Sequence, residues 1–66
     1  MKIEEAIRYF ERELEKIEEA EAIEASAAEP DEELLHAWSY EREGTDMALT
    51  ALRVTRARLV WLGIDV

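Results

Sequence analysis

Glu33 and His36 are the residues of this 66-residue chain whose types and spacing could bind a metal ion. A Glu-x-x-His pair places both groups on one face of a helix, and carboxylate-bridged di-metal bundles use two such pairs with two further glutamates. One chain supplies one pair, so a dimer would be required. Leu34 and Leu35 occupy the expected core positions, however. We therefore expect a solvated or hydrogen-bonded His36 that points away from the helix seam, with no metal site and no cofactor.

Other catalytic chemistry has little support in the sequence. The chain has one histidine, no cysteine, and three threonines and two serines without a strained turn to present them. Its two glycines lie nineteen residues apart and form no glycine-rich phosphate loop. We predict that the protein is not an enzyme.

The acidic charge lies in the first half of the chain. Residues 1–33 carry thirteen carboxylates against four basic residues, a net charge of −9, whereas residues 34–66 are neutral overall. A field of one sign selects partners by charge, and it disfavours direct contact with nucleic acid or with an anionic membrane. No apolar run approaches the ~20 residues of a membrane span, and the N-terminus has no apolar signal-peptide core. These features predict a cytoplasmic protein.

The elements that must position any site are helices. Apolar residues in the first third follow steps of four, three, four and three, which is a heptad seam: Ile3, Ile7, Phe10, Leu14 and Ile17. This spacing predicts a helix over about residues 2–27. Pro30 and the acids after it favour the start of a second helix, since proline and carboxylates suit the first helical turn. We therefore expect a turn at 28–30 and a helix over about 31–62.

Gly44 interrupts the second helix in one of two ways. It could end one helix, with Thr45 capping the next, or it could lie within one long helix and let another helix approach closely. We favour the long helix because one stripe of residues continues across the glycine: Leu35, Trp38, Arg42, Thr45, Leu49, Leu52, Arg56 and Leu59. Gly63 is expected to end this helix. The predicted fold is a single all-α domain over 1–66, an antiparallel helical hairpin.

A further prediction is self-association. Met47, Val54 and Trp61 make the second helix apolar beside its main stripe, and such a helix requires more than one neighbour. A core in so short a chain rarely supplies more than ~3–5 kcal/mol without a disulfide or another staple. Hairpins commonly dimerise into four-helix bundles. We expect a homodimer or higher oligomer.

Arg53 and Arg56 are candidate ligand-binding residues, because arginine suits bidentate contacts to carboxylate or phosphate. A plainer alternative also exists. In an antiparallel hairpin they lie near Glu4, Glu5 and Glu11 and would form ion pairs within or between chains.

Candidate partner-binding residues occur on both helices. Trp61 belongs to a run of four apolar residues, and aromatic residues are enriched at interface hot spots. Glu11, Glu15 and Glu18 belong to an acidic run that is either a solvated helix face or a surface that imitates nucleic-acid phosphates and occupies a basic groove.

Two short stretches resemble small orphan proteins of bacteriophages and prophages. The stretch Ile3-Glu4-Glu5-Ala6-Ile7-Arg8-Tyr9-Phe10-Glu11 is similar to their acidic "EAI-Y-E" helix, and Thr45-Asp46-Met47-Ala48-Leu49-Thr50-Ala51-Leu52-Arg53 to their "AIDMALxALR" helix. Gly44 and Thr45 stand where that pattern usually has Ala-Ile. The resemblance covers about half of the chain and implies a phage accessory role, often host takeover or defence evasion.

The stretch Ala48-Leu49-Thr50-Ala51-Leu52 also resembles the "ALTxL" helix of phage sponges that sequester cyclic oligonucleotides. Those proteins continue with an acidic pair and an alanine, where this chain has Arg53, Val54 and Thr55. The likeness implies Thr50 and Arg53 as ligand contacts. A sponge of this kind would use them, together with the candidate Arg56, at a subunit interface.

The leading hypothesis from the sequence is a small acidic protein of phage type. It would bind a basic surface of a host protein, for example a defence or nucleic-acid-binding protein, by charge mimicry. The alternatives are a cyclic-nucleotide sponge and a structural helical module with no partner beyond itself.

Overall fold

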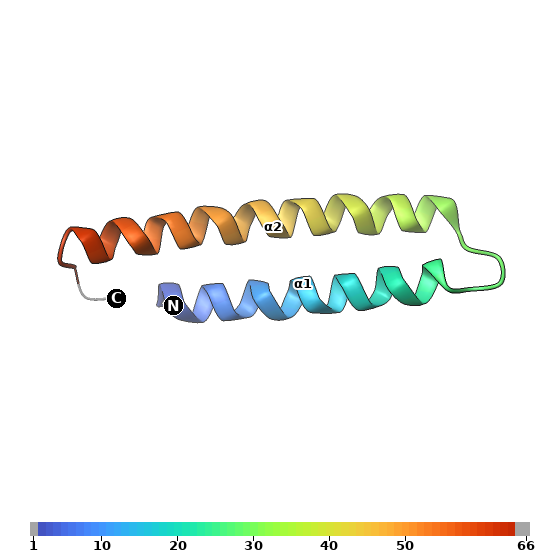
Figure 1. Cartoon of the computed structure of the whole chain (residues 1–66), viewed down its shortest axis with the longest axis horizontal. Helices are drawn as coiled ribbons and strands as arrows, with labels where there is room; N and C mark the ends of the chain where they lie inside the picture. The colour runs from blue at the N-terminus through green and yellow to red at the C-terminus, as the bar shows by residue number, and fades with distance from the viewer. Residues whose placement is uncertain (1, 65–66) are drawn as a thin grey trace.

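The computed structural model describes residues 2–64 and contains two long antiparallel helices, α1 (Ile3–Ala25) and α2 (Glu32–Trp61) (Figure 1). The molecule is a rod with principal extents of 52 × 15 × 15 Å. The beginning of α1 and the end of α2 lie at one end of this rod and the interhelical turn at the other, and α2 extends past the beginning of α1 (Figure 1). The all-α hairpin predicted from the sequence is confirmed.

The core of the hairpin is thin because each helix has only the other to pack against. Three apolar side chains of the described residues are buried: Ile7 and Ile17 of α1, at 3% and 8% exposure, and Leu49 of α2, at 0%. Ile7 and Ile17 belong to the predicted heptad seam, whose other members are half-buried. Burying one such side chain fully contributes about 1.5–3 kcal/mol, so this core stabilises the hairpin modestly.

Helix α2 runs through Gly44 without a break, as the favoured interpretation of the sequence required. The stripe on both sides of the glycine packs toward α1, with Trp38 and Thr45 half-buried and Leu49 fully buried. Tertiary packing of this stripe outweighs the helix cost of one glycine, which is about 1 kcal/mol. The three-helix alternative is therefore wrong.

The turn between the helices is closed by side chains that cap backbone groups. Asp31 is the N-cap of α2, and its Oδ1 accepts hydrogen bonds from the backbone N–H groups of Glu33 (3.0 Å) and Leu34 (3.2 Å). The Asp31 N–H donates to Oε1 of Glu24 at the end of α1, at 2.8 Å. Pro30 therefore precedes the cap instead of occupying the first helical turn, because the aspartate cap satisfies the N–H groups that begin the helix.

Gly63 ends α2 in a left-handed conformation, with φ of +78°. Its N–H donates to the carbonyl of Val60 at 3.0 Å, and the N–H of Ile64 donates to the carbonyl of Leu59 at 2.9 Å. This pair of bonds is a Schellman motif, which satisfies carbonyls at the helix end. The helix stop predicted at Gly63 is present.

Substitution by alanine at the two glycines should change the free energy of unfolding in opposite directions. A Cβ at Gly44 would meet no other atom within 4 Å, so Gly44→Ala should raise the free energy of unfolding by up to ~1 kcal/mol through helix propensity. Gly63→Ala should lower it by about 1–2 kcal/mol, since alanine is strained at positive φ. Urea denaturation followed by circular dichroism at one low protein concentration measures both. Equal effects of the two substitutions would contradict this account of the glycines.

Candidate interaction surface

Three ion pairs link α2 to α1 along the hairpin. Each joins an arginine of α2 to a glutamate of α1 at 3.2 Å: Arg42–Glu21, Arg53–Glu11 and Arg56–Glu4. These are contacts of the intramolecular kind that the sequence offered as the plainer role of Arg53 and Arg56. Glu5, which was also expected to take part, forms no ion pair with the described residues. The Arg42–Glu21 pair was not anticipated, although both residues continue the heptad stripes of their helices.

The three candidate ligand-binding residues, Thr50, Arg53 and Arg56, do not converge on one ligand site. Arg53 and Arg56 are held by carboxylates of α1, whereas the Thr50 hydroxyl donates to the backbone carbonyl of Asp46 at 2.9 Å. Thr50 lines a surface hollow together with Glu43 and Asp46, and neither arginine lines it. Two carboxylates beside Thr50 would repel the phosphates of a cyclic nucleotide.

The fold redistributes the charge that the sequence placed in the first half of the chain. The half of the rod at the turn, residues 15–47, holds twelve carboxylates against Lys16 and Arg42, a net charge of −10. The open half, residues 2–14 and 48–64, has a net charge of +2 because it combines the start of α1 with the arginines of α2. From residue 17 to residue 41 the chain has no lysine or arginine. The strongly negative region is therefore one end of the molecule.

The predicted partner-binding glutamates have different surroundings. Glu15 and Glu18 are exposed and form no ion pair with the described residues, so their charges are available to a partner. Glu11 is also exposed, but it is held by Arg53 in the open half. Further exposed carboxylates surround the turn itself: Glu29, Asp31, Glu32 and Glu33.

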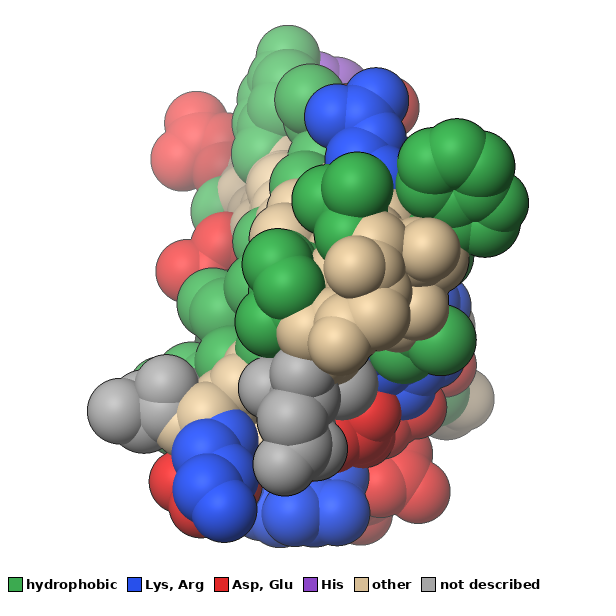
Figure 2. Space-filling view, turned by 90° about the vertical axis from the view of Figure 1, so that its left-hand side faces the viewer, with side chains coloured by type: hydrophobic (Ala, Val, Ile, Leu, Met, Phe, Trp, Pro, Cys, Tyr) green, Lys and Arg blue, Asp and Glu red, His purple; other side chains and the backbone are tan. Residues whose placement is uncertain are grey.

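Trp61 lies at the open end of the rod, away from the turn. It is 86% exposed, and it borders an apolar hollow with Val54, Ala57, Arg58 and Leu62. Figure 2 shows hydrophobic side chains gathered at this end of the molecule. Glu18 lies fifteen residues into α1, roughly 22 Å along the helix from its start. The structure therefore separates Trp61 from the acidic end, and the two do not form one compact contact surface.

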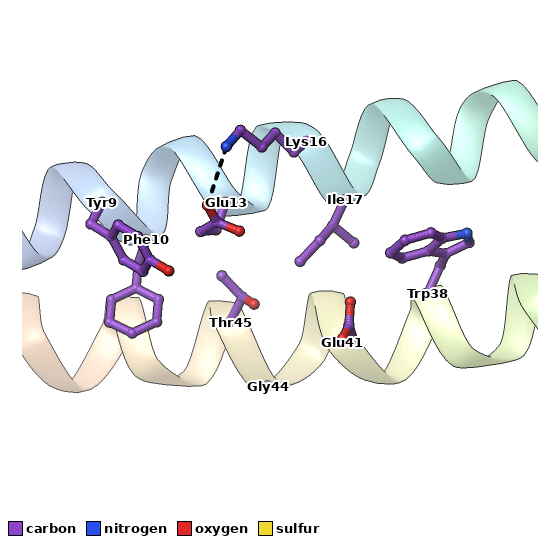
Figure 3. Close-up of a pocket in the computed structure, with 9 residues that line it drawn as sticks. All are labelled: Tyr9, Phe10, Glu13, Lys16, Ile17, Trp38, Glu41, Gly44 and Thr45. Atoms are coloured by element: carbon purple, nitrogen blue, oxygen red, sulfur yellow. Dashed lines mark hydrogen bonds and ion pairs between the residues drawn. The ribbon is translucent and has the colours of Figure 1, made fainter.

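A groove runs beside the helix seam near the middle of the rod (Figure 3). It has a volume of about 520 Å³, and Phe10, Ile17 and the half-buried Trp38 supply its apolar walls. Lys16 and Glu13 form an ion pair of 3.3 Å on its rim. The sequence did not predict this groove. The sequence feature that could have indicated it is the pair Gly44 and Thr45, because their small side chains leave space between larger neighbours.

His36 is exposed and lies on the side of α2 away from the seam, as the spacing indicated. Its ring packs edge-on against Tyr40, with ring centroids 5.3 Å apart. Within residues 2–64, no group of three or more His, Asp or Glu side chains is placed to hold a metal ion. Neither described helix is long and apolar enough to cross a membrane.

Comparison of the chain with protein-family models, with curated proteins and with solved structures gave no match.

The exposure of the arginine pairs predicts a small contribution to stability. Arg53→Ala and Arg56→Ala should each lower the free energy of unfolding by less than about 1 kcal/mol, because both side chains and their partners are more than a third exposed. Leu49→Ala is the contrasting variant and should cost about 2–5 kcal/mol, since Leu49 is fully buried. Urea denaturation measures all three. A loss at Arg56 as large as the loss at Leu49 would contradict the surface role of these pairs.

Proposed function

We propose that the protein is an interaction module whose acidic turn half binds a basic surface of another protein. The observation that carries this proposal is the net charge of −10 on residues 15–47, where exposed carboxylates such as Glu15 and Glu18 form no ion pair with the described residues. A field of one sign steers a complementary partner and excludes partners of like charge.

The density of this charge supports mimicry of a nucleic acid. Twelve carboxylates occupy about half of a rod 52 Å long, which is about one per 2 Å along its axis. Double-stranded DNA carries about one negative charge per 1.7 Å of its axis. A protein groove that binds DNA through lysine and arginine would therefore meet a similar linear charge in the turn half of this hairpin.

The proposed partner is a nucleic-acid-binding or defence protein of a host cell, encountered in the cytoplasm. This part of the proposal follows the resemblance of the two helices to phage accessory proteins. Binding of the acidic hairpin would block the partner's nucleic-acid site and so inhibit it.

Neutralising carboxylates at the turn half should weaken binding more than the same change at the open half. The test variant is Glu18→Gln with Glu19→Gln, and the matched control is Glu5→Gln with Glu13→Gln, which removes the same charge from the same helix. We expect the partner's Kd to rise about 3–10-fold for the test variant and to change little for the control, because only the test variant lowers the field at the turn.

Capture from host lysate on the immobilised full chain, identification of the retained protein and measurement of its Kd provide the readout. The retained protein should be basic, should elute with salt and should be displaced by a 20-base-pair DNA duplex. Recovery of the bait alone, a partner that DNA does not displace, or equal losses for both double variants would overturn the proposal and favour a structural module without a further partner.

A further inference from the structure

The side of α2 that faces away from α1 carries a row of large apolar side chains with no cover. Tyr40, Met47, Val54 and Trp61 are between 46% and 86% exposed and lie seven residues apart. Seven residues are nearly two helical turns, so these side chains lie in one line along the helix. Four exposed residues of this kind at one regular spacing form a continuous row rather than scattered surface positions.

The positions between these large residues are filled by three small residues and one arginine. Three residues before each large side chain the chain has Ala37, Gly44, Ala51 and, at the end of the row, Arg58. Together the two sets form a complete seam with alternating steps of three and four. We call this set of eight residues the outer seam.

The outer seam lies opposite the seam that packs on α1. Each residue of the outer seam comes two positions after a residue of the seam that packs on α1. Ala37, Tyr40, Ala51 and Trp61, for example, come two positions after Leu35, Trp38, Leu49 and Leu59. Two residues are about 200° around a helix, so the two seams occupy opposite sides of α2. Helix α2 therefore has two seams and, within one chain, one neighbouring helix.

We propose that the outer seam binds the outer seam of a second copy of this chain. The two α2 helices run antiparallel, and the two-fold axis that relates them crosses the interface at the level of residue 49 along α2. Such a pairing places residues that are equally far before and after position 49 opposite one another. Every small residue then meets a large one: Ala37 opposite Trp61, Gly44 opposite Val54, and Ala51 opposite Met47 of the second copy. Alternation of large and small side chains across facing positions is the arrangement that fills a helix interface without voids.

The charges of α2 favour the same orientation. Its first half, residues 32–46, has a net charge of −4, and its second half, residues 47–61, has a net charge of +3. Antiparallel pairing sets each negative half against a positive half, whereas parallel pairing sets like against like. Parallel pairing would also place Arg58 against Arg58 inside the seam.

Antiparallel pairing gives Arg58 a suitable partner. Arg58 forms no ion pair with the described residues, and the pairing centred on residue 49 sets it opposite Tyr40 of the second copy. A guanidinium over a tyrosine ring is a favourable cation–π contact. The interface runs from residue 37 to residue 61, about 36 Å of helix, and covers the apolar hollow beside Trp61. It leaves α1 and both acidic turns free, so it does not depend on the proposed function.

A lysine in the outer seam should dissociate the dimer. The test variant is Met47→Lys, and the matched control is Ile23→Lys; the two side chains are 72% and 67% exposed, and Ile23 lies on α1 outside both seams of α2. Sedimentation of the full chain over a concentration series should show a dimer for the wild type and for Ile23→Lys. We expect Met47→Lys to raise the dimer Kd at least about 100-fold, because the two ammonium groups of the dimer would lie in the apolar seam close to the two-fold axis, where they lose water and repel each other.

Circular dichroism should show unchanged helix content for both lysine variants, since neither residue belongs to the seam between α1 and α2. A wild type that stays monomeric to millimolar concentration would overturn the proposal and assign the face to a different protein or to solvent. A dimer that survives Met47→Lys would place the contact on another surface and overturn it equally.

Cross-linking tests the orientation, and the absence of native cysteines makes the result unambiguous. Ala37→Cys and Trp61→Cys chains are mixed and oxidised. Antiparallel pairing predicts a mixed disulfide between the two variants, because the two positions face each other. It predicts no disulfide between two Ala37→Cys chains, since these positions lie about 36 Å apart and a disulfide needs Cα atoms within about 7 Å. A disulfide between two Ala37→Cys chains, or a dimer that forms no mixed disulfide, would overturn the proposed register.

Discussion

The apolar seam between the two helices is the contact on which the rest of this structure depends. A helical hairpin has only one internal interface, and here its buried centre consists of Ile7, Ile17 and Leu49. Neighbouring seam residues remain half-buried because no third element covers them. The short connection at residues 26–31 requires the antiparallel alignment. The arginine–glutamate pairs along the seam add little to its stability, since exposed ion pairs contribute little energy.

The sequence predicted the fold well because the informative patterns are local. Heptad spacing, one proline and two glycines are sufficient to place two helices and a turn. Packing on α1 keeps α2 continuous through Gly44. The cap at Asp31 was harder to place, since proline and the acids after it fit several starting points for a helix. Its partner Glu24 lies seven residues away on the other helix, and such a contact depends on how the turn closes.

The candidate site was less accessible from sequence than the fold. Counting charges along the sequence assigned the negative charge to the first half of the chain. The hairpin instead brings the arginines of α2 beside the start of α1, so the excess of negative charge remains at the turn. Trp61 and Glu18 were grouped by residue type, and the structure separates them by roughly half of the 52 Å rod. Pairing between distant segments, such as Arg42 with Glu21, follows from the alignment of the helices and not from any local motif.

The separation of charge along the rod also makes the two ends electrically independent. The centres of the acidic and open halves lie about half of the 52 Å length apart, whereas the Debye length in physiological salt is about 8 Å. A molecule docked at the turn therefore does not sense the cationic groups near the chain ends, and a molecule docked near Trp61 does not sense the carboxylates of the turn. Each end of so small a protein behaves in solution as a separate surface, with its own dependence on ionic strength.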